Sequence, residues 1–161
     1  MSDSASENDD RTSAVGLLGY AHSYWVCASE INPRSIDASH PQAPIMYLYV
    51  HAIELYLKAF LRNAGCGLKE IKELSHGLRK LNDRAIKCRL PDSQLRTEVI
   101  EIMGPIHTLL RYIQTGPQKH PSLNDLWEVC RELHDFMEPR VHQATNLRRS
   151  RVIPNKPDYS E

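Results

Sequence analysis

The side chains best suited to chemistry in this sequence interrupt an apolar segment, residues 44–65 (PIMYLYVHAIELYLKAFLRNAG). Four polar residues recur along it at three- and four-residue spacing: His51, Glu54, Lys58 and Arg62. On a helix, at 100° per residue, they fall with Tyr47 within an arc of roughly 80°. The spacing therefore places an imidazole, a carboxylate, an ammonium and a guanidinium on one narrow strip of a helix that is otherwise apolar.

Two interpretations of this strip are open. Glu54 precedes Lys58 by four residues, the favourable orientation for an ion pair on a helix. If the strip faces solvent, the pair contributes only about 0.3–0.5 kcal/mol. If instead Glu54 and Lys58 line a partly buried seam that also receives His76, the desolvated pair needs further partners. Such a seam is a candidate binding site formed by Glu54, Lys58, His76, His51 and Arg62.

Metal, cofactor and nucleophile chemistry have little support in the motifs. Glu73-x-x-His76 matches the Glu-x-x-His spacing of di-iron bundles, but those sites need a second copy and two further carboxylates. His51-x-x-Glu54 is only a reversed fragment of that motif. The sequence has no P-loop, no G-x-G-x-x-G and no G-x-S-x-G. We therefore predict neither a metal site nor a cofactor.

The cysteines and the first residues indicate a reducing compartment. Cys27, Cys66, Cys88 and Cys130 are scattered, without a C-x-x-C motif. Residues 1–10 (MSDSASENDD) are polar and acidic, unlike the basic and apolar regions of a signal peptide. We expect a cytoplasmic protein whose thiols are free and mostly buried as small apolar groups.

The size and charge of the chain limit the kinds of partner that we expect. The chain has 161 residues, enough for one domain, with 20 basic and 20 acidic side chains. Balanced charge gives no strong overall attraction to nucleic acid, although a local basic patch remains open. The apolar run 45–61 approaches membrane length, but polar residues inside it argue against a span, and we predict no membrane partner.

The apolar periodicity predicts helices at 13–31, 44–63, 75–90, 92–113 and 122–137, with a short connecting segment at 68–74. Ser75 and Asp92 are the expected N-caps, Gly104-Pro105 is expected to kink or divide its helix, and Pro139 to end the globular part. Because no period-two strand pattern occurs, we predict an all-α fold. The predicted architecture is a bundle of four long helices plus a short connecting helix, over residues 12–139. Residues 1–11 should form a disordered acidic N-terminus and 140–161 a flexible basic tail.

Around residues 44–63 the apolar surface covers roughly 280° of the expected helix. A helix with so thin a polar strip is either central to its own bundle or packs against a second subunit as well. We therefore expect a homodimer. In the tail, the stretch LRRSR (147–151) has three arginines that could contact phosphate, although short basic tails are usually solvated.

Two sequence stretches together resemble the HEPN-like proteins. HAIELYLKAFLRNAG followed by ELSHGLRKLNDRA is similar to the family's I-E-L-x-L-K-A-x-L helix and its later L-x-H-x-L segment. The aromatic-rich YAHSYWVCA and the Leu110-Arg111-Tyr112 ending fit the same pattern, so the resemblance covers roughly residues 13–137. It implies an up-and-down helical bundle, commonly a homodimer, of toxin–antitoxin, antiphage or nucleotide-linked systems.

Many proteins of this family are metal-independent ribonucleases. Their signature is an Arg followed about four to six residues later by His on a late helix, where Arg stabilises phosphate charge and His transfers protons. Arg34 and His40 have this spacing but lie in the Pro-rich loop. Arg111 and His120 are too far apart, and two further residues, Arg131 and His134, are too close.

The missing signature favours an interaction module over an enzyme. We expect a dimeric accessory component of a defence, stress or toxin–antitoxin-type system that binds a protein partner, RNA or a nucleotide near Glu54, Lys58 and His76. The alternative is a divergent metal-independent endoribonuclease toxin that uses His76 with Lys58 or Arg111.

Overall fold

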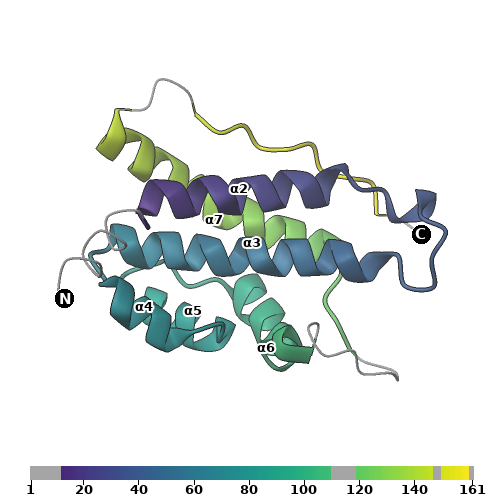
Figure 1. The fold of residues 1–161 in the computed structure, drawn as a ribbon, viewed down its shortest axis with the longest axis horizontal. Helices are drawn as coiled ribbons and strands as arrows, with labels where there is room; N and C mark the ends of the chain where they lie inside the picture. Colours follow the sequence, from purple (N-terminus) through teal and green to yellow (C-terminus); the bar gives the residue numbers. More distant parts are fainter. Residues whose placement is uncertain (1–11, 110–118, 147–149, 160–161) are drawn as a thin grey trace, which may run out of the picture.

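The computed structural model describes residues 12–109, 119–146 and 150–159 (Figure 1). The described elements are α2 (Ala14–Glu30), η1 (Pro33–Ser35), α3 (Gln42–Asn63), α4 (Leu68–Leu74), α5 (Leu78–Lys87), α6 (Gln94–Leu109) and α7 (Leu123–Thr145). Within these ranges there are helices and no strand, which confirms the all-α prediction. None of these helices combines the length and apolar character that crossing a bilayer requires.

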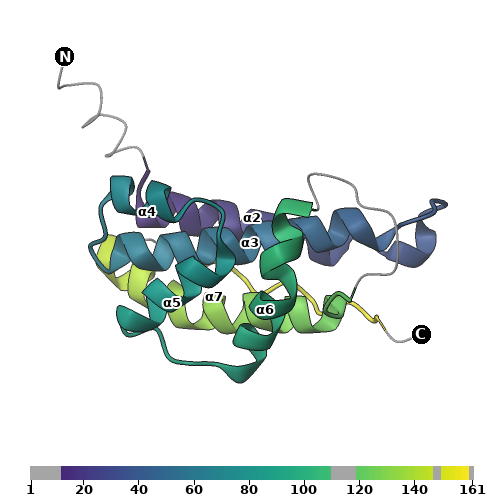
Figure 2. The same cartoon turned by 90° about the horizontal axis from the view of Figure 1, so that it is seen from below.

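Helix α3 is the centre of the molecule. It contacts α2, α7, α4, α5 and α6, with α2 on one side of it and α4, α5 and α6 on the other (Figures 1 and 2). Twelve of its 22 residues are buried, including Tyr49, Tyr56 and Leu57. The chain's own helices therefore cover the apolar surface of residues 44–63. This confirms the central-helix alternative and removes the apolar surplus that suggested a second subunit.

Helix α2 lies along α3 because its apolar residues recur on one face. Its buried positions are Leu18, Ala21, Trp25 and Ala28, at spacings of three and four residues. Ser13 caps the helix by accepting a hydrogen bond from the Gly16 N–H at 3.1 Å. The Trp25 ring packs edge-on against Tyr56 of α3 and at a tilt against Trp127 of α7. This aromatic contact joins α2, α3 and α7, the three longest of the described helices.

Two predicted N-caps are wrong. Ser75 ends α4 instead of opening α5, and Gly77 occupies the N-cap position of α5. Asp92 accepts a hydrogen bond from the Ser93 N–H at 2.8 Å, whereas Ser93 caps α6 by accepting from the Arg96 N–H at 3.2 Å. Gly77 has the extended backbone of an N-cap residue, and Ser93 has the hydroxyl oxygen that accepts the capping hydrogen bond. A sequence pattern does not distinguish between such neighbouring positions.

Prolines interrupt the helices less than expected. The predicted division at Gly104-Pro105 is wrong, because α6 continues as one helix to residue 109. The helix tolerates the one backbone hydrogen bond that the proline removes. Pro139 does not end the globular part either, since α7 continues to Thr145. The apolar register explains this, because Met137 and Val141 on either side of the proline are both buried. Residues 110–113 lie outside the described residues.

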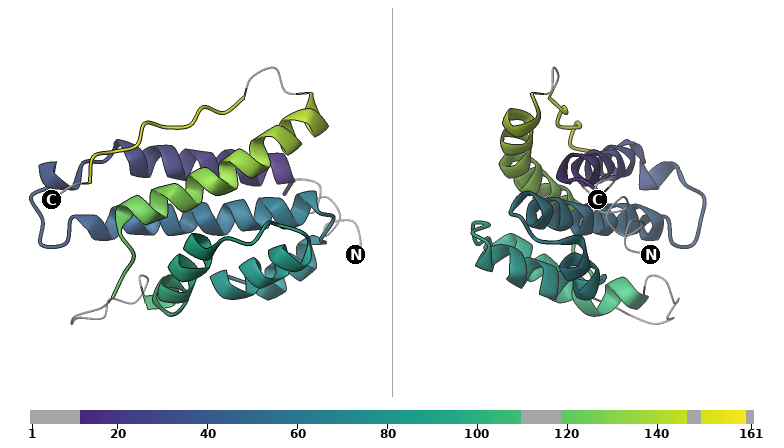
Figure 3. Two further views of the ribbon diagram at one scale, coloured as in Figure 1. Left: turned by 180° about the vertical axis from the view of Figure 1, so that it is seen from behind. Right: turned by 60° about the vertical axis from the view of Figure 1, so that its left-hand side comes forward.

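The tail prediction is corrected over residues 150–159, which we call the C-terminal strap. It runs back along α2 and α7 as an extended segment (Figure 3). Arg151 pairs with Glu138 of α7, and the Tyr159 hydroxyl lies 2.6 Å from that of Tyr49 on α3. These side-chain contacts to the helices hold the strap, which the basic composition of the tail alone did not indicate.

Candidate functional site

Three residues singled out in the sequence come together in a buried cluster. Glu54 is buried in α3, with 1% of its side chain exposed. Its Oε1 accepts hydrogen bonds from the Lys58 Nζ at 2.6 Å and from the His76 Nδ1 at 2.8 Å. Lys58 comes from the next turn of α3, and His76 from the turn between α4 and α5. The exposed-edge interpretation is therefore wrong for Glu54, and the seam interpretation agrees with the geometry.

The cluster fixes the protonation pattern of His76. A carboxylate only accepts hydrogen bonds, so the Nδ1 of His76 carries a proton that it donates to Glu54. In the neutral imidazole this leaves Nε2 as the basic nitrogen. Lys58 supplies the positive charge that compensates the buried carboxylate. With 48% of its side chain exposed, His76 joins a buried ion pair to the protein surface.

The backbone before His76 is strained. Ser75 has φ 55° and ψ −130°, a region where a side chain other than glycine costs about 1–3 kcal/mol. Hydrogen bonds hold this turn, from the Ser75 N–H to the Lys72 carbonyl at 3.0 Å and from the Gly77 N–H to the Leu74 carbonyl at 3.2 Å. The strained turn directs His76 back towards Glu54, and such strain is common where a side chain is held for function.

The other two residues of the strip have their own surroundings. The His51 ring packs edge-on against Tyr24, with centroids 4.5 Å apart, and stacks on Tyr47 at 6.0 Å. Arg62 donates hydrogen bonds to the Thr12 carbonyl at 3.0 Å and to a carbonyl in the α3–α4 loop. Arg62 therefore anchors the N-terminal end of α2, and His51 packs within the α2–α3 contact.

The remaining catalytic pairs suggested by the sequence do not form a site in the described ranges. Arg111, the third catalytic candidate, lies outside the described residues. Arg34 and His40 are both exposed in the loop around η1. On α7, Arg131 is exposed and pairs with acidic neighbours of its own helix, whereas His134 is buried.

His76 lies in a segment with an excess of basic residues, which the balanced total charge concealed. Residues 68–89, which we call the basic layer, contain seven basic and three acidic residues: Lys69, Lys72, Arg79, Lys80, Arg84, Lys87 and Arg89 against Glu70, Glu73 and Asp83. All seven basic residues except Arg84 are exposed, and Arg84 pairs with Glu70. Helices α4 and α5 form this layer on the side of α3 opposite α2 (Figures 1 and 2). Charge counted by segment would have revealed it.

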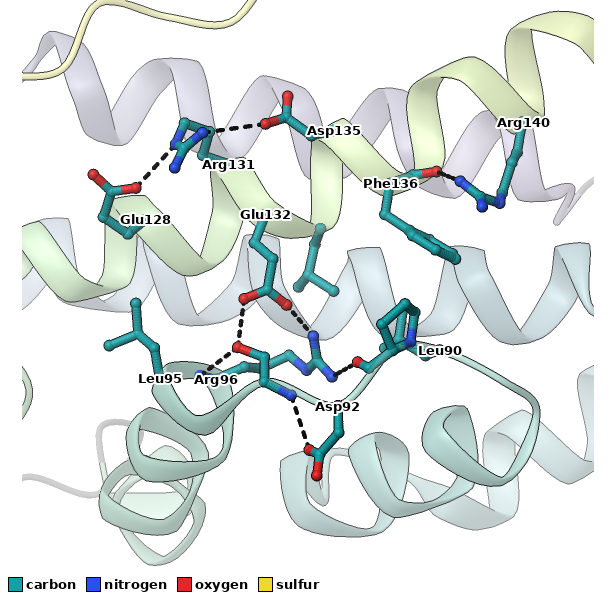
Figure 4. A pocket seen from close by; sticks show the side chains of 13 residues that line it. Leu90, Asp92, Leu95, Arg96, Glu128, Arg131, Glu132, Asp135, Phe136 and Arg140 are labelled. Atoms are coloured by element: carbon teal, nitrogen blue, oxygen red, sulfur yellow. Dashed lines mark hydrogen bonds and ion pairs between the residues drawn. The ribbon is translucent and has the colours of Figure 1, made fainter.

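A second charged cluster lies where the loop before α6 meets α7, beside a cleft of about 640 Å³ (Figure 4). Arg96 is buried there. It donates from Nε to Asn82 at 2.8 Å, from Nη1 to Glu132 and from Nη2 to the Pro91 carbonyl. Because each nitrogen of the guanidinium donates to a different part of the chain, we assign Arg96 a structural role. Neither the burial of this residue nor its partners were evident from the sequence.

A third polar cluster lies under the C-terminal strap. His134 of α7 is buried, its Nδ1 accepts from the Tyr56 hydroxyl at 3.1 Å and its Nε2 donates to the Arg151 carbonyl at 3.1 Å. Burial lowers the pKa of His134 and raises the pKa of Tyr56 well above its ordinary value. His134 therefore stays neutral and Tyr56 keeps its proton at neutral pH.

Among the described residues no group of three or more His, Cys, Asp or Glu side chains is arranged to hold a metal ion. Comparison with protein-family models, with curated proteins and with solved structures finds no match to this chain.

Proposed function

We propose that this chain is an HEPN-like helical module that binds RNA or a nucleotide at the basic layer around His76. The single observation that carries the proposal is the half-exposed His76, held by the buried Glu54 inside a segment with seven cations and three anions. In the wider proposal, which rests on the family resemblance, it is a cytoplasmic, dimeric accessory component of a defence, stress or toxin–antitoxin-type system. The up-and-down topology of the helical bundle is part of this wider proposal and rests on the same resemblance.

The charge distribution supports an anionic partner. Exposed lysines and arginines on one face raise the local concentration of phosphate-bearing ligands even when the whole protein is neutral. Helix α5 starts at Leu78, two residues after His76, and its N-cap residue Gly77 has no side chain with which to cap the first turn. The partial positive charge of that helix end adds to the field of the basic layer.

The cost of the cluster also supports a role beyond stability. A buried ion pair is rarely more stabilising than apolar residues of the same volume, and the turn at Ser75 adds backbone strain. Both features hold one imidazole in a defined tautomer and orientation. An oriented imidazole among cations is suited to donate to a phosphate oxygen when protonated and to accept a proton through Nε2 when neutral.

Fluorescence anisotropy with labelled single-stranded RNA tests the binding. The variant Lys72→Glu/Lys80→Glu should bind at least about tenfold more weakly at low salt, and its log affinity should fall less steeply with log salt, by about one to two ions. Arg34→Glu/Lys119→Glu changes the total charge equally at exposed positions away from the layer, and should retain most of the affinity. Equal losses in both variants would contradict a site at the basic layer.

The second candidate function is a metal-independent endoribonuclease, and the observation that favours it is the Glu54–His76 hydrogen bond. A carboxylate that holds Nδ1–H leaves Nε2 as a general base for the 2′-hydroxyl group of RNA. Purified protein in EDTA should then cleave total RNA, with activity lost in His76→Ala and reduced in Lys58→Ala. Binding that survives without any cleavage would favour the interaction module.

A further inference from the structure

The C-terminal strap lies against α7 in a matched, antiparallel register. Arg151 pairs with Glu138 and Lys156 with Glu128, with Nη1···Oε2 at 3.2 Å and Nζ···Oε1 at 2.6 Å. Ten residues of helix rise about 15 Å, and five residues of extended chain span about 16 Å. An extended segment with two cations five residues apart therefore meets two carboxylates ten residues apart on α7.

Two histidines bind the backbone of the strap. His134 donates through Nε2 to the Arg151 carbonyl at 3.1 Å, and His22 of α2 donates through Nε2 to the next carbonyl, that of Val152, at 2.7 Å. The two imidazole rings lie 5.4 Å apart between centroids. Val152 is 71% exposed, and its hydrogen bond to His22 is through its main-chain carbonyl, which any extended peptide would offer.

The contact residues are built into the rigid part of the fold. His134 and Glu138 are 2% and 7% exposed and project from α7. The Tyr56 hydroxyl orients His134 from α3. Glu138 accepts from both the backbone N–H and the guanidinium of Arg151, at 2.9 and 3.2 Å. The helices packed around α3 therefore hold two imidazole N–H donors and two carboxylates in place for an extended chain.

We infer that the surface of α2 and α7 under the strap is a recognition site for an extended basic peptide of a partner protein, which the strap occupies in cis. The partner segment carries an Arg and, five residues later, a Lys, and it docks by displacing residues 150–159. Charge and spacing specify it: Glu138 and Glu128 pair with the two cations, and the two histidines bind the carbonyl groups at and after the Arg. This protein-binding site is independent of the anionic site proposed at the basic layer.

The tether explains why displacement is needed. A segment that is joined by a short connection to the surface it contacts binds that surface at an effective concentration of about millimolar. A partner peptide therefore occupies this surface only when it binds more tightly than the strap or when the strap is weakened. The strap thus determines the affinity that a partner peptide needs.

Binding of the fluorescent peptide SRVIPNKPDY, residues 150–159, to full-length protein tests this inference. The variant Arg151→Ala/Lys156→Ala weakens the strap and should bind the peptide at least about tenfold more tightly than wild type does. Adding Glu138→Gln and Glu128→Gln should abolish that gain, as should replacing the peptide's Arg by Ala. Equal binding to all variants, or no binding to the weakened variant, would overturn the inference.

Two further measurements keep the test decisive. Circular dichroism melts show whether each variant is folded. Hydrogen exchange of the wild-type chain needs no substitution, so it tests the strap even if a variant fails to fold. The Arg151 N–H, which bonds Glu138, should exchange faster than the amides of α7, because the strap opens without global unfolding. Exchange of this amide only through global unfolding would overturn the inference. So would a weakened variant that forms larger oligomers than wild type does at micromolar concentration, because the occupant would then be a second copy of this chain.

Discussion

The Nδ1 atom of His76 lies 2.8 Å from the Oε1 atom of Glu54, although the two residues are 22 positions apart. This hydrogen bond connects the central helix to the turn between α4 and α5. Because Lys58 donates to the same oxygen at 2.6 Å, the carboxylate positions both hydrogen-bond donors. The position of His76 at the surface therefore depends on a charge inside the protein.

Removing that charge should destabilise the fold. Glu54→Ala leaves the Lys58 ammonium, whose side chain is 16% exposed, beside an apolar space. We expect a loss of about 2–4 kcal/mol in the free energy of unfolding, measured by urea denaturation. Glu73→Ala removes an exposed carboxylate on α4 and should change the midpoint little. A loss below about 0.5 kcal/mol for Glu54→Ala would contradict the buried-pair geometry.

The buried His134 should make stability depend on pH. Burial lowers its pKa in the folded chain, whereas the unfolded chain takes up a proton near pH 6.5. Stability from this group is therefore complete above about pH 6.5 and is lost as the pH falls below it. Urea midpoints of wild type should decrease more between about pH 7 and pH 5 than those of His134→Gln. The exposed His120, replaced by Gln, is the matched control and should leave the wild-type pH profile unchanged.

Arg96 should not be replaceable by lysine. Its guanidinium reaches Asn82, Glu132 and the Pro91 carbonyl at once, and a single ammonium does not span three acceptors in these directions. Arg96→Ala should cost about 3 kcal/mol in urea denaturation, and Arg96→Lys should recover less than half of that loss. Arg131→Ala, which removes exposed pairs on α7, should cost little. A full recovery by lysine would show that charge alone is needed there.

Residue patterns predicted the elements better than their ends. Apolar residues spaced three and four apart identified the helices, including a central one around Glu54, because burial follows helical periodicity. The caps at Ser75 and Asp92 were misplaced by one or two residues, since the backbone angles that decide a cap depend on the following turn. Pro139 was misjudged because tertiary burial of Met137 and Val141 outweighs one lost helix hydrogen bond.

Part of the candidate site was predictable from the sequence. The i, i+4 spacing of Glu54 and Lys58 indicated their pair, and the short segment that follows the central helix indicated His76 as a third member. Long-range partners were not predictable, because contacts between residues such as His134 and Arg151 depend on the path of the chain after α7. The buried Arg96 was missed for the same reason, since its acceptors lie on three separate segments.

Long-range ¹H–¹⁵N NMR spectra of the histidine side chains, recorded with and without single-stranded RNA, test the proposed site most directly. We predict that neutral His76 carries its proton on Nδ1, as the hydrogen bond to Glu54 requires, and that RNA shifts its ring signals. The exposed His120, outside the basic layer, serves as the internal reference and should be unaffected. A His76 protonated only on Nε2, or RNA binding that leaves its signals unchanged, would contradict the proposed site.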